Sequence, residues 1–152
     1  AGNPLPESGN LFISVRDEDK KDVIPLARRL ADSGFTLFAT SGTSTVLREN
    51  NIKSRALFKI SQAKPSVLDM MDEGEIQWII NTPSSSTASR IDEIKMRNRA
   101  VIKGIPITTT ISGLRAAING LDALREMNRM EVCSLQEYHR HSPKLKLPKV
   151  EA

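Results

Sequence analysis

Short apolar runs alternate with segments of helical periodicity along most of this chain. The runs 11–15, 35–39 and 76–81 are typical of strands buried within a parallel sheet. Between the first two, 19–33 carries apolar residues at helical spacing and is followed by Gly34, a plausible helix stop. The whole pattern predicts strands over 11–15, 35–39, 54–58, 76–81 and 105–108, and helices over 19–33, 44–50, 66–73, 91–103 and 112–125.

The alternation of strand and helix predicts an α/β fold class. We expect one three-layer domain with a mostly parallel sheet of about five strands flanked by helices. Residues 1–9, rich in Pro and Gly, are interpreted as a linker, 10–141 as the domain and 142–152 as a flexible basic tail. Within the domain, 132–135 is expected to form an edge segment or a loop.

Charge and composition argue against nucleic acids and membranes as binding partners of this chain. The 22 Lys and Arg residues exceed the 18 Asp and Glu residues, but part of the excess falls in 139–149, which contains no acid. The compact part is therefore close to charge balance, which disfavours a nucleic-acid interface. No apolar run is long enough to span a bilayer. The single cysteine, Cys133, excludes an intrachain disulfide and is expected to be a small packing residue.

The N-terminus is interpreted as a cut within a longer polypeptide, because it begins at Ala1 without Met and shows no signal-peptide pattern. A bacterial cytoplasm or a plastid stroma is the expected compartment. His139 and His141 lie near the end of the chain without acidic or cysteine partners at ligand spacing, so no metal site is expected.

The segment 40–43, Thr-Ser-Gly-Thr, joins an apolar strand to the start of a helix. Backbone N–H groups, hydroxyls and a helix N-terminus converge at such a turn, which can hold a phosphate group. Lys20, near the start of the preceding helix, is placed to supply a cation beside it. The alternative is an ordinary strand-to-helix turn with a capping residue, in which Lys20 is only solvated.

Other polar residues follow the predicted strands and would share one edge of the sheet. Asn81 could contact a ligand or equally bond a loop carbonyl, while 84–86 reads as a flexible loop or as one that folds over a ligand. Trp78 is expected in the core, and Lys59 alone reads as an exposed lysine. The polar residues expected at this edge are Thr40, Ser41, Thr43, Asn81, Thr82, Ser84, Ser85, Ser86, Thr109 and Thr110.

Several spaced blocks in order resemble one family. These blocks are Ser14-Val15-Arg16, Asp19-Lys20, Gly34-Phe35, 39–43, 79–82, 97–100, Thr109-Thr110 and 131–139. The chain resembles, over about residues 9 to 141, the methylglyoxal-synthase-like domain, and most closely the regulatory domain at the C-terminal end of the carbamoyl-phosphate synthetase large chain. The resemblance implies a methylglyoxal-synthase-like fold of the flavodoxin/Rossmann type and a regulatory domain that is not an enzyme by itself. The glutamine-hydrolysing ligase activity, which serves pyrimidine and arginine biosynthesis, would belong to parts outside this chain.

The resemblance also implies an allosteric site for the inhibitor UMP and, in some members, IMP, with no intrinsic cofactor, metal or catalytic residue. Phosphate-binding positions of the family match Lys20, Thr40 and Thr43, a second basic position matches Lys59, and ribose and phosphate positions match Asn81 and Thr82. The implied effector-binding residues are Lys20, Thr40, Ser41, Gly42, Thr43, Lys59, Asn81, Thr82, Thr109 and Thr110.

Three departures from the family pattern bear on the site. Where ornithine-responsive members read Tyr-Asp-Thr, this chain has Ile107-Thr108-Thr109, so only Thr109 matches the ornithine position. Pro83 replaces a threonine found in many relatives, and 96–99 replaces an Arg-Arg pair. The implied partners are the ATP-using domains of the same large chain and the glutaminase small subunit.

Two other classes remain open. An enzyme like methylglyoxal synthase would need carboxylate and histidine groups for proton transfer, but both histidines lie beyond residue 138 and Asp19 is the only acid placed at the edge. The cyclohydrolase half of the bifunctional purine enzyme is a second related enzyme. Its basic Lys-Thr-Leu-His-Pro stretch is absent from this chain. The third class is a structural or oligomerising module, in which the helix 112–125 would form the interface. A core-facing helix would show the same spacing of apolar residues. These residues are Leu114, Ala117, Ile118, Leu121 and Leu124.

Overall fold

The computed structural model describes residues 5–60 and 62–141, with side chains as far as residue 136. Its strands form one sheet in the order β3-β2-β1-β4-β5, and every neighbouring pair is parallel. The expected α/β class is confirmed. The strands are β1 (Asn10–Ser14), β2 (Thr36–Thr40), β3 (Arg55–Leu57), β4 (Trp78–Asn81) and β5 (Ile107–Thr108).

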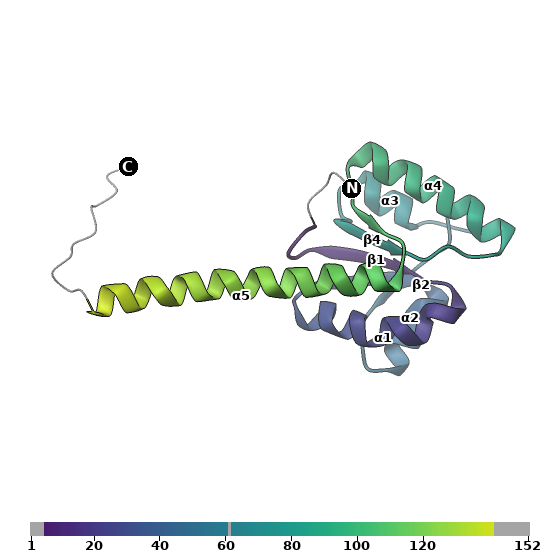
Figure 1. Cartoon of the computed structure of the whole chain (residues 1–152). Helices are drawn as coiled ribbons and strands as arrows, with labels where there is room; N and C mark the ends of the chain where they lie inside the picture. Colours follow the sequence, from purple (N-terminus) through teal and green to yellow (C-terminus); the bar gives the residue numbers. More distant parts are fainter. Residues whose placement is uncertain (1–4, 61, 142–152) are drawn as a thin grey trace. The chain divides into compact units, whose positions relative to one another are not determined.

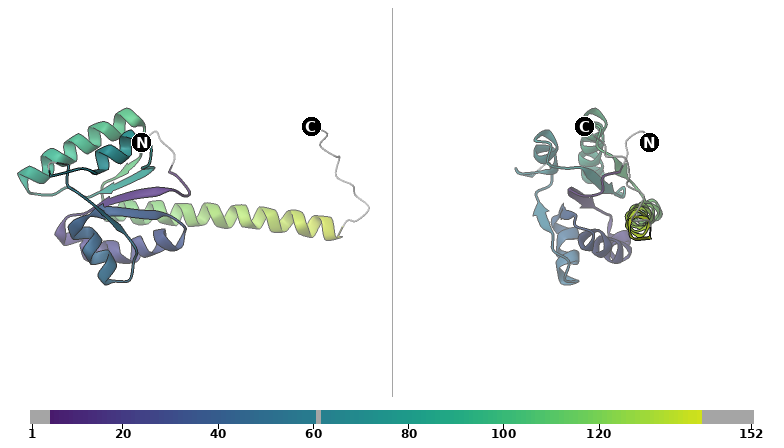
Figure 2. Two further views of the ribbon diagram at one scale, coloured as in Figure 1. Left: turned by 180° about the vertical axis from the view of Figure 1, so that it is seen from behind. Right: turned by 90° about the vertical axis from the view of Figure 1, so that its left-hand side faces the viewer.

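Helices cover both faces of the sheet. α1 and α2 pack together on one face, and α3 and α4 pack together on the other (Figure 1). The same two helical layers are seen from other directions in Figure 2. The helices are α1 (Asp17–Asp32), α2 (Ser41–Glu49), α3 (Val67–Asp72), α4 (Thr87–Lys103) and α5 (Ile111–His141).

Trp78 lies in the core, as its place in an apolar strand predicts. Its side chain is fully buried, its ring and that of Phe35 make a T-shaped contact, and its Nε1–H donates to Thr108 Oγ1 at 3.0 Å. A second apolar cluster, which includes Phe12, Ile79 and Met96, is also buried. Alternate residues of β1 and β4 are buried on opposite faces of the sheet, as a sheet covered on both faces requires.

The strand register fixes where polar side chains gather. Ser14 pairs with Asn81 across β1 and β4, and Ile13 pairs with Ala39 across β1 and β2. Because all three strands run the same way, Ser14, Asn81 and Thr40 reach the same edge of the sheet together. This carboxyl edge is where open parallel sheets bind ligands.

Three helices begin two or more residues earlier than their apolar periodicity indicates. α1 starts at Asp17, α2 at Ser41 and α4 at Thr87, whereas the sequence predicted starts near 19, 44 and 91. The first turn of α1 is acidic, and those of α2 and α4 consist largely of small hydroxyl residues, so none of them contributes to an apolar repeat. By contrast, the cap of α3 was predicted correctly, because Ser66 and Asp69 form a capping box there.

The last helix is much longer than predicted. α5 runs from Ile111 to His141, so both the predicted end at residue 125 and the expected edge segment or loop at 132–135 are wrong. No Pro or Gly interrupts 121–141, and most of 123–131 consists of good helix formers. Cys133 lies on this helix and is exposed, so it is not the packing residue that was expected.

The chain divides into two compact units, Ala1–Ile118 and Asn119–Ala152. The first unit contains the sheet, and in it Leu114 and Ile118 are buried, as core-facing residues of a helix are. The described part of the second unit is the remainder of α5. The predicted tail 142–152 and the start of the predicted linker lie outside the described residues. Among the residues that the structure describes, no helix is long and apolar enough to cross a membrane.

The C-terminal cap of α4 gives a test of the fold. Gly104 has a φ of 70°, and Ile105 N–H donates to Ala100 O at 2.9 Å to close the helix end. We expect Gly104→Ala to lower the free energy of unfolding by about 1 kcal/mol, because an L side chain is strained in this conformation. Gly104→Asn is the matched control and should cost less, since Asn tolerates the left-handed region better. Equal losses in urea unfolding would contradict the assigned cap.

Candidate functional site

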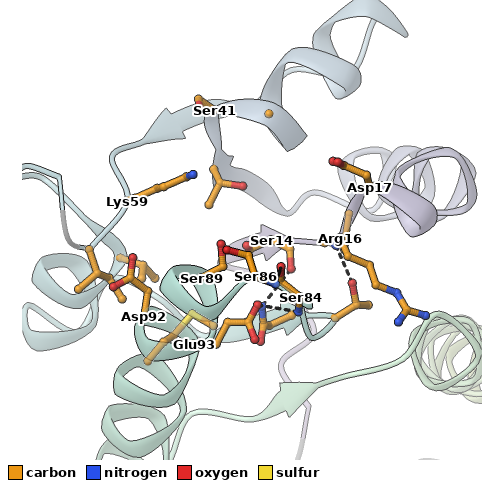
Figure 3. Close-up of a pocket in the computed structure, with 18 of the residues that line it drawn as sticks. Ser14, Arg16, Asp17, Ser41, Lys59, Ser84, Ser86, Ser89, Asp92 and Glu93 are labelled. Carbon is orange, nitrogen blue, oxygen red and sulfur yellow. Dashed lines mark hydrogen bonds between the residues drawn. The ribbon is translucent and has the colours of Figure 1, made fainter.

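A cavity of about 520 Å³ opens at the carboxyl edge of the sheet. It is lined by residues that follow β1, β2, β3 and β4, as the strand order and register require (Figure 3). Its volume falls in the range of small-molecule sites. The expected binding residues that line it are Lys20, Thr40, Ser41, Gly42, Lys59, Asn81 and Thr82, together with Ser84, Ser85 and Ser86.

Three expected binding residues do not line this cavity. Thr43 is buried, and its Oγ1 accepts hydrogen bonds from Val15 N–H at 3.5 Å and from the hydroxyl of Thr40 at 3.3 Å. Thr110 caps the start of α5 by accepting the N–H of Gly113 at 2.9 Å. Thr109 likewise lies outside the lining.

Four helix N-termini border the cavity, and they differ in charge. The first turn of α1 carries Asp17, Glu18 and Asp19, which offset the positive end of its dipole. The first turn of α3, whose Val67 lines the cavity, carries Asp69. The first turns of α2 and α4 contain no acid. Residues from both starts, Ser41 and Ser89, line the cavity. The starts of α2 and α4 are therefore the favourable places for an anion, since their free N–H groups and dipoles are not offset by an acid in the first turn.

Lys20 reaches from α1 to the start of α2. A Cβ atom at position 42 would lie 3.0 Å from Lys20 Nζ, so the glycine there permits this close approach. The amino group also pairs with Asp17 Oδ1 at 2.5 Å. The hydrogen bond from Lys20, and then its charge, lower the pKa of Asp17 below its usual value. The predicted juxtaposition of the lysine and the Thr-Ser-Gly-Thr turn is present.

Lys59 supplies a second cation from the segment after β3. Its side chain extends into the cavity, whereas the guanidinium of Arg16 points away from it (Figure 3). Arg16 is instead held by Asp19, whose Oδ2 accepts from Arg16 Nε at 2.8 Å. Two lysines thus enter the cavity from separate elements, and the arginine belongs to its outer rim.

The serine loop before α4 is folded against that helix. Ser84 N–H donates to Glu93 Oε1 at 2.9 Å, and Ser86 N–H donates to Ser84 Oγ at 3.1 Å (Figure 3). These bonds hold three consecutive hydroxyl groups along one wall of the cavity. The loop therefore has a defined conformation that Glu93 anchors.

Asn81 forms the floor of the cavity and is fully buried. Its Nδ2 donates to Ser14 O at 3.1 Å, and its Oδ1 accepts from a terminal nitrogen of Arg97 at 3.2 Å. Arg97 Nε is buried without a hydrogen-bond partner. Asn81 thus makes the bond to a backbone carbonyl that the sequence analysis gave as one possibility, and it also lines the cavity.

Thr82, like Asn81, both makes structural hydrogen bonds and lines the cavity. Its Oγ1 accepts from Arg16 N–H at 2.9 Å, and its own N–H donates to Ser14 O at 3.2 Å. The hydroxyl hydrogen of Thr82 is still available to a ligand, because a hydroxyl both donates and accepts. Thr82 therefore joins the ends of β1 and β4 while it faces the cavity.

The acids at this edge were predicted incorrectly. Asp19 does not line the cavity, whereas Asp17, Glu18, Asp92 and Glu93 do. The misplacement arose because α1 starts two residues earlier than predicted and because Asp92 and Glu93 lie on the second turn of α4, whose start was predicted too late. Among the residues that the structure describes, no group of three or more His, Cys, Asp or Glu side chains is arranged to hold a metal ion.

One wall of the cavity is apolar. Phe58, Ile60, Val67 and Met96 line it, and Phe58 is 52% exposed. An exposed aromatic ring beside a cavity offers a stacking surface for a planar group. The cavity thus combines an anion-favouring side with an apolar side.

Comparison with known proteins places the chain among MGS-like domains, whose family model matches residues 22–109. The chain is 41% identical over 139 residues to the carbamoyl phosphate synthase large chain of Methanoculleus marisnigri, covering 91% of this chain and 13% of that protein. It is 43% identical to the C-terminal section of the large chain of Methanocaldococcus jannaschii, over 90% of this chain and 22% of that protein. The chain therefore spans only a minor part of the length of these relatives.

Two solved structures share the fold. The crystal structure of methylglyoxal synthase from Elizabethkingia anophelis matches with a TM-score of 0.58 at 14% identity, over 75% of this chain and 79% of the other. The crystal structure of ForH matches with a TM-score of 0.55 at 14% identity, over 76% of this chain and 80% of the other. At such identity the likeness concerns the fold alone.

The ion pair at the start of α1 gives a second test. We expect Lys20→Met to raise the pKa of Asp17 toward its ordinary value of 3.8, because the lysine lowers it in the folded chain. With the lysine present, the pairing contributes stability above pH 3.8 and loses it as the pH falls through the lowered folded pKa. A carbon NMR titration of the Asp17 carboxyl group measures this shift. Lys21→Met, at an exposed neighbour, should leave the titration unchanged, and an equal effect of both variants would contradict the assignment.

Proposed function

Because this chain belongs to the family of MGS-like domains, we propose that it binds a nucleoside monophosphate effector as the regulatory part of a carbamoyl phosphate synthase large chain. One observation carries the proposal: two helix starts without acids and two lysines, Lys20 and Lys59, meet at a single cavity. That combination favours a dianionic group such as phosphate. UMP is the proposed inhibitor and IMP an alternative effector.

The phosphate would lie at the start of α2. There the hydroxyls of Thr40 and Ser41 and the backbone at Gly42 border the cavity, and Lys20 lies beside them. Binding would exchange the contact between Lys20 and Asp17 for a contact between Lys20 and the phosphate. Since Asp17 is largely exposed, its carboxylate can return to water at small cost.

The ribose and base would extend toward Asn81, Thr82 and the apolar wall. Thr82 retains a hydroxyl hydrogen for a ribose oxygen, and the ring of Phe58 offers a face for the base. The serines of the loop before α4 add further donors and acceptors. Uracil and hypoxanthine would differ only at this end of the site, so the apolar wall is where UMP and IMP would be distinguished.

Regulation would act through the remainder of a large chain. The ATP-using domains of the same large chain and the glutaminase small subunit are the proposed partners in carbamoyl phosphate synthesis for the pyrimidine and arginine pathways. An effector changes activity only if its affinity differs between two states of the enzyme. Ornithine at Thr109 would be a separate contact, because Thr109 does not line the cavity.

Calorimetric titration of the chain with UMP, IMP and ornithine tests this proposal. We expect saturable binding of at least one nucleotide, and we expect Lys20→Met and Lys59→Met each to weaken it about tenfold, since each removes a charged contact to phosphate. Ornithine should not compete with the nucleotide, because Thr109 does not line the cavity.

Lys21→Met serves as the matched control, since it removes one positive charge from the same helix at an exposed position. It should leave the affinity within about twofold of the unaltered chain, apart from the general loss of charge. Failure of a folded chain to bind either nucleotide would contradict the proposal, and so would nucleotide binding that neither Lys20→Met nor Lys59→Met weakens.

A further inference from the structure

A second cleft, of about 650 Å³, lies at the amino end of β2, whereas the cavity described above lies at the carboxyl end of that strand. It is lined by the start of β2, the end of α2 and the segment that leads into β3, and is called here the α2–β3 cleft. The strand register explains the opening. β2 begins at Thr36, but β3 pairs with it only from Phe38 onward, so β3 leaves the first residues of β2 uncovered.

Three cations line the α2–β3 cleft without a partner. Arg48, Lys53 and Arg55 are exposed, and among the described residues none of them makes an ion pair or a hydrogen bond through its side chain. No Asp or Glu belongs to the described lining, whereas four acids line the carboxyl-edge cavity. The cleft therefore favours an anion. Two of its cations are guanidinium groups, which bind carboxylate and phosphate groups through paired hydrogen bonds.

The end of α2 is adapted to a negative charge nearby. The carbonyl groups at a helix C-terminus carry partial negative charge and would normally repel an anion. Here the carbonyl oxygens of 46–48 accept hydrogen bonds from the Asn50 side chain and from the N–H groups of 50–52, at 2.8–3.1 Å. Arg48, in the last turn, adds a positive charge at the same place. This helix end thus presents a cation beside carbonyl groups that are already bonded.

The turn after α2 holds the cationic segment in place. Asn51 has a φ of 61°, in the left-handed region that Asn tolerates better than most residues. Arg28 of α1 donates to Asn50 O at 2.7 Å, and the hydroxyl groups of Ser54 and Ser44 bond each other at 2.7 Å. Because both ends of this turn are fixed, a ligand need not order the segment before it binds, which lowers the cost of binding.

We propose that the α2–β3 cleft is a second anion-binding site, for a small molecule that carries several phosphate or carboxylate groups. Its volume lies within the range of small-molecule sites. The hydroxyl of Thr36 and the amide of Asn51, which also line it, supply uncharged donors beside the three cations. The proposal is independent of the nucleotide site, because no described residue lines both the cleft and the carboxyl-edge cavity.

Amide NMR titrations of the 152-residue chain test this site, with sodium tripolyphosphate and sodium citrate as separate probes. We expect saturable shifts at the amides of 51–55 with at least one probe. The probe that binds more tightly identifies the preferred group as phosphate or carboxylate. Because each shift is assigned to a residue, binding here is distinguished from binding at Ser41 and Gly42 in the carboxyl-edge cavity.

Removal of the cations should weaken this binding. We expect Arg48→Gln, Lys53→Gln and Arg55→Gln each to raise the dissociation constant of the tighter probe about threefold, since contacts of exposed charges are individually weak. The triple variant should raise it about thirtyfold, because the effects of separate charges are nearly additive.

The matched control is the triple variant Lys21→Gln, Lys95→Gln and Arg115→Gln. It removes the same charge from exposed positions outside both linings, so it should raise the dissociation constant no more than about threefold. All six substituted positions are exposed, and every variant should retain the dispersed amide spectrum of the folded chain.

Each of three results would overturn the proposal. The first is the absence of a saturable shift at 51–55 with either probe. The second is a triple variant of the cleft that weakens binding no more than the control triple variant does. The third is a hexaglutamate peptide or a single-stranded oligonucleotide that binds at 51–55 more tightly than both small probes, since this would assign the cleft to an extended macromolecule.

Discussion

The parallel, in-register pairing of β1 with β2 and β4 is the constraint on which the site depends. It brings Ser14, Thr40 and Asn81 to one edge of the sheet. Each of these strands is followed by a helix or a short loop and a helix, so the starts of α1, α2 and α4 all border one cavity. A shift of one residue in this register would turn the buried strand residues to the opposite face and separate the helix starts.

The ends of β1 and β4 are joined by more than the sheet. Asn81 and Thr82 both donate to the carbonyl of Ser14, and Thr82 also accepts the N–H of Arg16. Arg97 holds the other end of the Asn81 amide from α4. Loss of a partner in such a buried group leaves a polar atom unsatisfied, which costs about 1–3 kcal/mol. The floor of the cavity is thus a rigid network rather than a set of independent ligands.

Charge is distributed unevenly around this floor. The start of α1 is acidic, whereas the starts of α2 and α4 contain no acid. Lys20 lies between the acidic start of α1 and the start of α2, because it pairs with Asp17 and its amino group lies beside Gly42. An anion that enters the cavity would compete with an exposed carboxylate for this lysine. That competition lowers the affinity for the anion. The same ion pair with Asp17 holds the Lys20 amino group in position before an anion binds.

Much of the fold and part of the site could be predicted from the sequence. The apolar runs and helical periods predict the alternating elements, and the turn after β2 predicts a helix start with a lysine beside it. Arg97 could not be assigned to the floor, because its contact with Asn81 depends on how α4 packs against the sheet. The burial of Thr43 escaped prediction, since a local pattern does not record a tertiary contact. The length of α5 was underestimated because the prediction followed the apolar repeat, which ends at Leu124, although 121–141 contains no Pro or Gly to stop a helix.

If an anion binds in the cavity, it lies at the start of α2 beside Lys20. Amide NMR spectra of the chain, recorded during addition of UMP and separately of inorganic phosphate, distinguish this site from others. We expect the amides of Ser41 and Gly42 to shift with both ligands, and residues of the apolar wall to respond to UMP alone. Shifts confined to residues outside the cavity, or no saturable shift at the start of α2, would contradict this site.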